Sequence, residues 1–253
     1  MSNELLKIDY DGQVAVVRLN RGVTNAINGD LVTELAAAVR QVSEQPDIRA
    51  LVLASANEKF FSIGWDIPQL IGFEKREFAD FFARYNRACL DLYTLPKPTV
   101  AAITGHAIAG GCILTLCCDY RYLADGKKLV GLNEIKLGAP LPYVVDRVLP
   151  ALVGGRYARA IMESGDFYDP AAALQMGLVD AVLPQDQVLP ASVEKARTLG
   201  AMPEQAFVVI KRNRTAEVEK AIRAQLDKQE SCFVECWYSP EARERLKAAA
   251  AKF

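Results

Sequence analysis

A double glycine, Gly110-Gly111, lies between two apolar segments of the chain. The segment before it, 99–104, is β-prone, a turn of small residues occupies 105–109, and a helix-like run continues to Cys118. The first N–H groups of a helix have no partner within it, and the positive end of the helix dipole lies there. Because small and apolar side chains surround these groups, the pattern predicts a turn that binds an oxygen anion closely. Tight packing of a helix on a strand is the alternative reason for glycine here.

A glutamate follows in the segment GLNEIKLG, where Glu134 lies between the apolar residues Leu132 and Ile135. A surface position is the alternative, because it is the commonest one for glutamate. A carboxylate in an apolar setting has a raised pKa and can take and return a proton near neutral pH. Together with an anion-binding turn, it is suited to moving protons next to a carbonyl group.

The elements expected around these residues alternate between strands and helices. β-Branched or apolar runs predict strands at 14–19, 48–55, 99–104, 120–123 and 181–183. Helices are expected after Asn28 or Asp30, over 73–93, and after Asp169, which precedes a proline. From 188 onward the pattern indicates helices alone, with breaks near Pro203 and Pro240. The chain therefore predicts an α/β fold with a helical C-terminal part.

Three segments together resemble the crotonase, or enoyl-CoA hydratase/isomerase, superfamily: FFSIGWDI at 60–67, AIAGGCILTLCCDYR at 107–121 and GLNEIKLG at 131–138. The resemblance extends over nearly the whole chain. It implies a crotonase-like spiral of ββα units over 1–195 and a C-terminal helical oligomerisation segment over 196–253. It also implies a homo-trimer or a dimer of trimers. Within the superfamily the chain is most similar to the mitochondrial-type Δ3,Δ2-enoyl-CoA isomerases.

The resemblance implies roles for individual residues. The backbone N–H groups of Trp65 and Gly110 would form an oxyanion hole, and Glu134 would transfer the proton. Backbone at Ala26, Ile63 and Gly64 would hold the coenzyme A part of the substrate. Further substrate-binding candidates are Asp66, Gly111, Ile113 and Asn133. Candidates for phosphate contacts are Lys211, Arg212 and Arg214, for which a solvated basic helix end is the alternative. The acyl pocket is expected from 70–85 and 141–145, with a neighbouring subunit as a further source.

The position of Ile113 bears on the reaction. Hydratases of the superfamily have a second glutamate there, and two carboxylates can activate a water and protonate carbon. A single carboxylate moves a proton on one face, so the aliphatic residue favours an isomerase that converts 3-enoyl-CoA to 2-enoyl-CoA. Hydration, thioester hydrolysis and non-catalytic acyl-CoA binding are the alternatives. No cofactor is expected, because coenzyme A arrives as part of the acyl-CoA thioester substrate.

Composition limits the other classes of function. The chain has 253 residues, of which 51% are apolar, enough for a large core. Its 30 Lys and Arg residues balance 31 Asp and Glu residues, so nucleic acid is not an expected partner. No run of eighteen apolar residues predicts a membrane span. The six cysteines form no CxxC pair and His106 is the single histidine, so no metal site is expected, and reduced thiols favour a cytoplasmic location.

Overall fold

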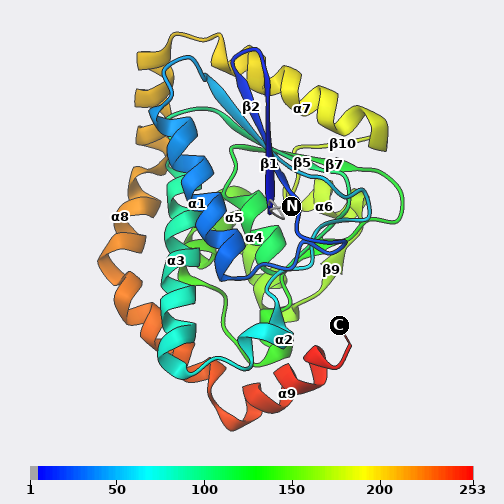
Figure 1. Ribbon diagram of the computed structural model, residues 1–253, viewed down its shortest axis with the longest axis vertical. Helices are drawn as coiled ribbons and strands as arrows, with labels where there is room; N and C mark the ends of the chain where they lie inside the picture. Colours follow the sequence, from blue (N-terminus) through cyan, green and yellow to red (C-terminus); the bar gives the residue numbers. More distant parts are fainter. Residues whose placement is uncertain (1–4, 253) are drawn as a thin grey trace.

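The computed structural model describes residues 5–252 and has an α/β architecture (Figure 1). In the larger sheet the strand order is β1-β2-β3-β5-β7-β10, and neighbouring strands are parallel except β1 and β2. Its strands are β1 (Leu6–Asp11), β2 (Val14–Leu19), β3 (Ala50–Ser55), β5 (Thr99–Ile103), β7 (Tyr120–Ala124) and β10 (Ala181–Leu183). A smaller sheet, in the order given, contains β4 (Phe60–Ser62), β6 (His106–Ile108), β8 (Val130–Gly131) and β9 (Phe167–Tyr168).

Helices surround both sheets in the described chain. In chain order they are α1 (Gly29–Glu44), α2 (Ile67–Leu70), α3 (Lys75–Tyr93), α4 (Gly110–Leu116), the 3-10 helix η1 (Glu134–Leu137), α5 (Tyr143–Ser164), α6 (Pro170–Met176), α7 (Gln185–Gly200), α8 (Glu204–Trp237) and α9 (Pro240–Ala250). None of the helices in the described residues is long and apolar enough to cross a membrane.

Three consecutive stretches of chain repeat one pattern, two strands followed by a helical segment. In each unit the first strand joins the larger sheet and the second joins the smaller sheet: β3 and β4, then β5 and β6, then β7 and β8. Corresponding strands of successive units pair in parallel, so the units stack as a spiral. The structure therefore confirms the α/β fold class and the ββα rhythm.

Local capping signals define several helix ends as the sequence predicted. Asn28, one of the two candidates, caps α1 by accepting a 3.0 Å hydrogen bond from the N–H of Leu31. Asp169 caps α6 in the same way, accepting from the N–H of Ala172 at 2.8 Å. Gly177 ends α6 in the left-handed conformation, with φ of 79°. These short-range contacts require no knowledge of the rest of the fold.

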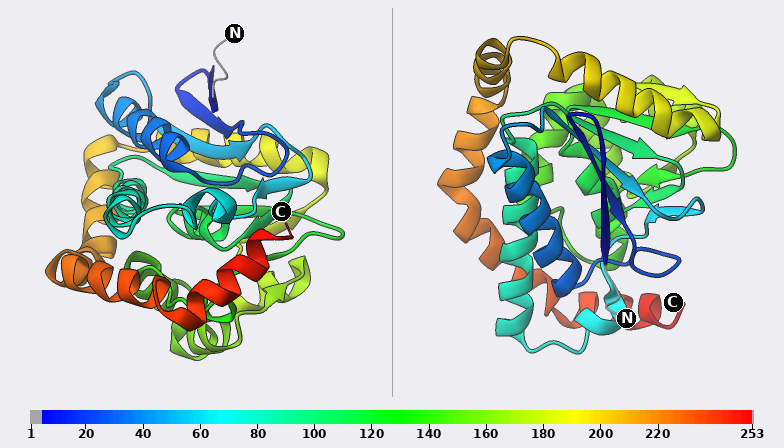
Figure 2. Two further views of the ribbon diagram at one scale, coloured as in Figure 1. Left: turned by 60° about the horizontal axis from the view of Figure 1, so that its bottom comes forward. Right: turned by 45° about the horizontal axis from the view of Figure 1, so that its top comes forward.

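The C-terminal helices belong to the same core as the spiral. The expected boundary after residue 195 falls inside α7, which packs on the larger sheet through Val188 and Val193 (Figure 2). Helix α8 runs beside α3, and α9 crosses beneath the core next to α2 and η1. Ile222, Phe233 and Leu246 from these helices are buried in the main apolar cluster. The last helices thus complete the interior around residues of the motif segments.

Candidate active site

The turn before α4 has an unusual backbone conformation. Ala109, between β6 and α4, has φ of 48° and ψ of −123°, a region that residues with side chains rarely adopt. Gly64, on the segment after β4, also has a positive φ of 91°. A Cβ atom on Gly64 would lie 3.0 Å from the backbone nitrogen of Gly110. The two backbone segments therefore meet with no space for a side chain between them.

The N–H groups of Trp65 and Gly110 are free to bind a ligand. The neighbours of Trp65 pair with Ile27: the N–H of Ile27 donates to the Gly64 carbonyl at 2.8 Å, and the N–H of Asp66 donates to the Ile27 carbonyl at 2.9 Å. The N–H of Trp65 therefore faces the opposite side of its segment. Gly110 is the first residue of α4, where an N–H has no acceptor within the helix. Within residues 5–252 neither N–H group has a hydrogen-bond acceptor.

Glu134 is a buried carboxylic acid at the start of η1. It is 6% exposed, and its Oε2 atom has no hydrogen-bond partner in the described chain. Burial raises its pKa to about 7, because the charged form is poorly solvated there. The group can therefore accept and release a proton near neutral pH, as the sequence predicted. The amide oxygen of the preceding residue, Asn133, is also buried without a partner.

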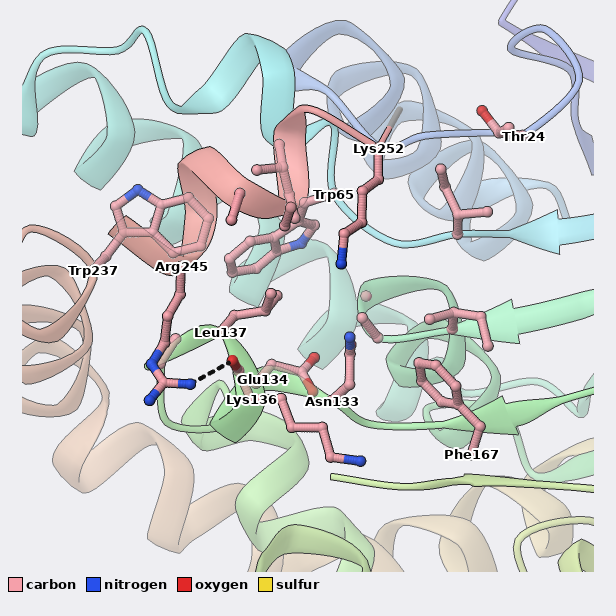
Figure 3. A pocket seen from close by; sticks show the side chains of 18 of the residues that line it. Thr24, Trp65, Asn133, Glu134, Lys136, Leu137, Phe167, Trp237, Arg245 and Lys252 are labelled. Carbon is pink, nitrogen blue, oxygen red and sulfur yellow. Dashed lines mark hydrogen bonds between the residues drawn. The ribbon is translucent and has the colours of Figure 1, made fainter. Parts of the chain in front are cut away.

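One cavity of about 750 Å³ brings these groups together. Trp65, Gly110, Asn133 and Glu134 all line it, and Ile63 lies in its wall. Figure 3 shows the side chains of Trp65, Asn133 and Glu134 in the middle of the cavity. Five of the residues singled out from the sequence thus share one space, which holds two free N–H groups and a titratable carboxylic acid.

The other backbone candidates lie behind the cavity wall. The guanidinium of Arg21 donates to the carbonyl oxygen of Ala26 and to the carboxylate of Asp66, each at 2.7 Å. Asp66 also caps α2, so its contacts within the described chain are structural. A Cβ atom on Gly111 would lie 2.5 Å from the carbonyl oxygen of Ser62, so glycine is required there for close packing.

Ile113 does not face the cavity, contrary to the expectation. It is fully buried and is absent from the residues that line the cavity. Helix α4 points its N-terminal end at the cavity, and all seven of its residues are buried. A residue one turn into such a helix lies behind the first turn and packs in the core.

The basic residues expected at the coenzyme A phosphates are placed elsewhere. Lys211 is 3% exposed and donates to the carboxylate of Asp119 at 2.7 Å and to the Lys97 carbonyl at 3.0 Å. Arg214 pairs with the same carboxylate, and Arg212 is exposed on α8 away from the cavity lining. The prediction for Lys211 is wrong, because its ammonium group stabilises a buried carboxylate.

Three other cations stand at the cavity: Lys136, Arg245 and Lys252. Lys136 pairs with Asp166 at 2.5 Å, and Arg245 donates to the Lys136 carbonyl at 3.4 Å (Figure 3). The ammonium group of Lys252 has no hydrogen bond or ion pair with any described residue, and its side chain points into the cavity. Arg245 lies on α9, and Lys252 lies two residues beyond its last residue, Ala250. The sequence shows both cations near its C-terminal end, but nothing local shows that this part of the chain covers the cavity.

The expectation that residues 70–85 and 141–145 form the acyl pocket is also corrected. None of these residues lines the cavity, whose aromatic wall includes Phe233 and Trp237 from α8. The aromatic residues of α3 form a second layer. The ring centroids of four of them lie 5.3 to 6.1 Å from that of Trp65: Phe78, Phe81, Phe82 and Tyr85. The segment 70–85 thus supports the pocket from behind, and α8 supplies Phe233 and Trp237 to its surface.

Comparison with known proteins agrees with this geometry. A family model described as enoyl-CoA hydratase/isomerase matches residues 9–251, and the chain belongs to that family of enzymes. It is 34% identical over 190 residues to mitochondrial enoyl-CoA delta isomerase 1 of Mus musculus, covering 74% of this chain and 66% of the mouse protein. It is 27% identical over 241 residues to crotonyl-CoA hydratase of Syntrophomonas wolfei, covering 92% and 91%.

A solved structure shows the same likeness in three dimensions. The human mitochondrial delta3-delta2-enoyl-CoA isomerase superposes with a TM-score of 0.95, at 27% identity, over 98% of each chain. The crotonase-like fold, with its C-terminal helical part, is thereby confirmed, as is the likeness to isomerases of the mitochondrial type. Relatives named for isomerisation and for hydration both occur among the matches.

Proposed function

We propose that this protein is an enoyl-CoA isomerase that moves the double bond of a 3-enoyl-CoA into conjugation, giving a 2-enoyl-CoA. Glu134, as carboxylate, takes a proton from C2, and the electron pair delocalises onto the thioester oxygen and, through the C3–C4 double bond, onto C4. The N–H groups of Trp65 and Gly110 donate hydrogen bonds to that oxygen in the dienolate. Glu134 then returns the proton to C4, and the C2–C3 double bond forms as the carbonyl group is restored. Atoms and charge balance without a co-reactant.

One observation carries this assignment above all. Glu134 is the only carboxylic acid among the described residues that line the cavity. A single acid can carry a proton between two carbons on one face of the substrate. Hydration by two carboxylates would need a second acid in the cavity, and none of the described lining residues supplies one. Magnitudes also support the proposal: one oxyanion donor contributes about 3 kcal/mol in the transition state, and a general acid–base group about 10²–10⁴-fold in rate.

The binding of coenzyme A is part of the proposal. Its phosphates are anionic, and the cations nearest to the cavity are Lys136, Arg245 and Lys252. The two N–H donors fix the thioester deeper in the cavity, so the phosphates would lie toward the exposed ammonium groups of Lys136 and Lys252. The transfer of a proton between carbons needs no metal or redox group, and coenzyme A arrives with the substrate.

The oligomeric state is a further proposal, a homo-trimer or a dimer of trimers. Exposed apolar side chains near the start of α8 support it: Val209 and Ile210 are 50% and 66% exposed. Sedimentation at micromolar concentration measures it, and a monomer would contradict it. The cytoplasmic location stays an expectation from the sequence.

The activity is tested with a 3-enoyl-CoA as substrate and absorbance of the conjugated product as readout. Glu134→Gln keeps the shape of the side chain and removes the base, so turnover should fall by about 10²–10⁴-fold. Affinity for a saturated acyl-CoA should stay near the parental value in that variant. Near-parental isomerisation by Glu134→Gln would show that another group transfers the proton. A parent that hydrates a short 2-enoyl-CoA as fast as it isomerises would overturn the isomerase assignment.

A further inference from the structure

We propose that Trp237 forms the closed end of the acyl site and so sets the longest acyl chain that the cavity accepts. The inference rests on the proposed function, in that the ligand is an acyl-CoA. It concerns the tail of that ligand, however, and can be tested without turnover.

The cavity has an exposed end and a buried end. At the exposed end lie Phe167, which is 40% exposed, and the exposed cations Lys136 and Lys252. At the other end lie Phe233 and Trp237, each 2% exposed. Figure 3 shows Trp237 and Phe167 on opposite sides of the view.

The reacting groups lie between the two ends, with Trp65 and Glu134 near the middle of the view (Figure 3). A thioester held there carries two substituents, the acyl chain and coenzyme A, which must extend in different directions. The phosphate-bearing part of coenzyme A requires water and cations, which the exposed end offers. The apolar tail is therefore directed toward Phe233 and Trp237, where apolar surface can be buried.

The indole of Trp237 is fixed by the layer behind it. It stacks on Phe78, with ring centroids 4.5 Å apart and an interplanar angle of 13°. It also contacts Trp65, at 5.7 Å between centroids. A side chain held by packing on this layer has no room to swing aside for a longer tail.

The backbone that follows Trp237 is also anchored. The hydroxyl of Tyr238 donates to the Phe73 carbonyl at 2.7 Å, and Arg243 donates to the Ile71 carbonyl at 2.6 Å. These two bonds tie the corner between α8 and α9 to the segment that joins α2 and α3. The wall that carries Trp237 is therefore part of the rigid framework around the cavity.

A fixed wall has a measurable consequence for affinity. Each methylene that is moved from water into an apolar site strengthens binding by about fourfold. The affinity of saturated acyl-CoAs should therefore rise with chain length up to a limit and then stop rising or fall. Removing the indole should move that limit to longer chains, because the space in front of Phe78 becomes available.

The experiment measures dissociation constants by calorimetry for saturated acyl-CoAs of increasing length. The parent is compared with Trp237→Ala, which removes the indole, and with Trp237→Phe, which keeps an aromatic wall. Phe82→Leu is the matched packing control, because Phe82 is buried in the layer behind and does not line the cavity. We expect the limit to move to longer chains in Trp237→Ala and to stay in Phe82→Leu. Trp237→Phe should stay close to the parent.

The outcomes separate this inference from the proposed reaction. An unchanged limit in Trp237→Ala, or a parental affinity that rises without limit, would overturn the role of Trp237. Failure of the parent to bind any acyl-CoA would overturn the inference and the proposed function together. If the chain-length limit moves in Trp237→Ala but the parent does not isomerise a 3-enoyl-CoA, the role of Trp237 is supported and only the proposed reaction is overturned. If thermal unfolding shows that Trp237→Ala is not folded, Trp237→Leu takes its place with the same expected direction.

Discussion

The hydroxyl group of Tyr85 donates a 2.7 Å hydrogen bond to the carbonyl oxygen of Gly110. Tyr85 is buried on α3, so the bond ties that helix to the first turn of α4, where the N–H of Gly110 is presented. Burial raises the pKa of Tyr85, and the charge of Glu134 contributes to this increase. The hydroxyl therefore stays protonated and remains a donor while Glu134 changes its charge.

Tyr85→Phe should lower kcat by about tenfold and leave KM near the parental value. The ring is kept, but the Gly110 carbonyl loses a buried donor, and the turn loses a restraint that orients its N–H. A single intramolecular hydrogen bond contributes about 1 kcal/mol net, so the free energy of unfolding should fall by a similar amount. Steady-state kinetics and denaturant unfolding check both changes. An equal loss of affinity for acyl-CoA and for its thioether analogue, with kcat unchanged, would assign Tyr85 to general packing alone.

The rate of isomerisation should depend on the charge of Glu134. Its pKa of about 7 means that the carboxylate, which is the base, is depleted as the pH falls below 7. The value of kcat/KM should therefore decrease toward acid with an apparent pKa near 7. A profile that is flat between pH 5 and pH 8, on the order of the range over which this group titrates, would contradict the assignment of the base.

The same pKa predicts how stability changes with pH. The ordinary pKa of a glutamate is 4.5, and burial in the folded protein raises the pKa of Glu134 to about 7, so the folded state holds this proton more tightly. Its contribution to stability is therefore full at low pH and is lost as the pH rises from 4.5 to 7, by roughly 3 kcal/mol. In Glu134→Gln, the free energy of unfolding should not show this part of the decrease with pH. The difference in unfolding free energy between parent and variant, measured across that range, checks the sign.

Ile113→Glu should destabilise the protein without creating a hydratase. Ile113 is fully buried and lies behind the cavity wall, so a carboxylate there would lack both water and a partner. We expect a fall of several kcal/mol in the free energy of unfolding, on the order of the cost of burying an unpaired charge. Ile113→Leu, a near-isosteric control, should cost less than about 1.5 kcal/mol. Efficient hydration of a short 2-enoyl-CoA by the glutamate variant would show that position 113 reaches the ligand.

Lys136→Ala and Lys252→Ala should each raise KM for enoyl-CoA substrates and have little effect on kcat. Both side chains line the cavity, and their charges would attract the phosphates of coenzyme A. The effect should weaken at high salt and disappear with enoyl-pantetheine substrates, which lack the nucleotide phosphates. Arg212→Ala is the matched control, because Arg212 is exposed and does not line the cavity. Equal effects of all three substitutions would indicate a general loss of positive charge.

The sequence by itself determined the local features of this protein. The cap at Asn28, the turn into Gly110 and the strand at 14–19 follow from backbone preferences and contacts between near neighbours. The acid at Glu134 could be singled out because its immediate neighbours are apolar. These features depend on a few consecutive residues, so a pattern of residue types is sufficient to predict them.

Only the tertiary structure decided which side chains share the cavity. Lys211 reaches Asp119 across 92 residues of sequence, and Tyr85 reaches Gly110 across 25, so no local pattern reports either bond. Trp237 lines the cavity because α8 returns along α3, and Ile113 leaves it because α4 points its end, not its side, at the ligand. Such contacts arise when separate apolar faces are buried against one another. Their partners are set by the packing of the whole chain, because burial depends on which faces meet.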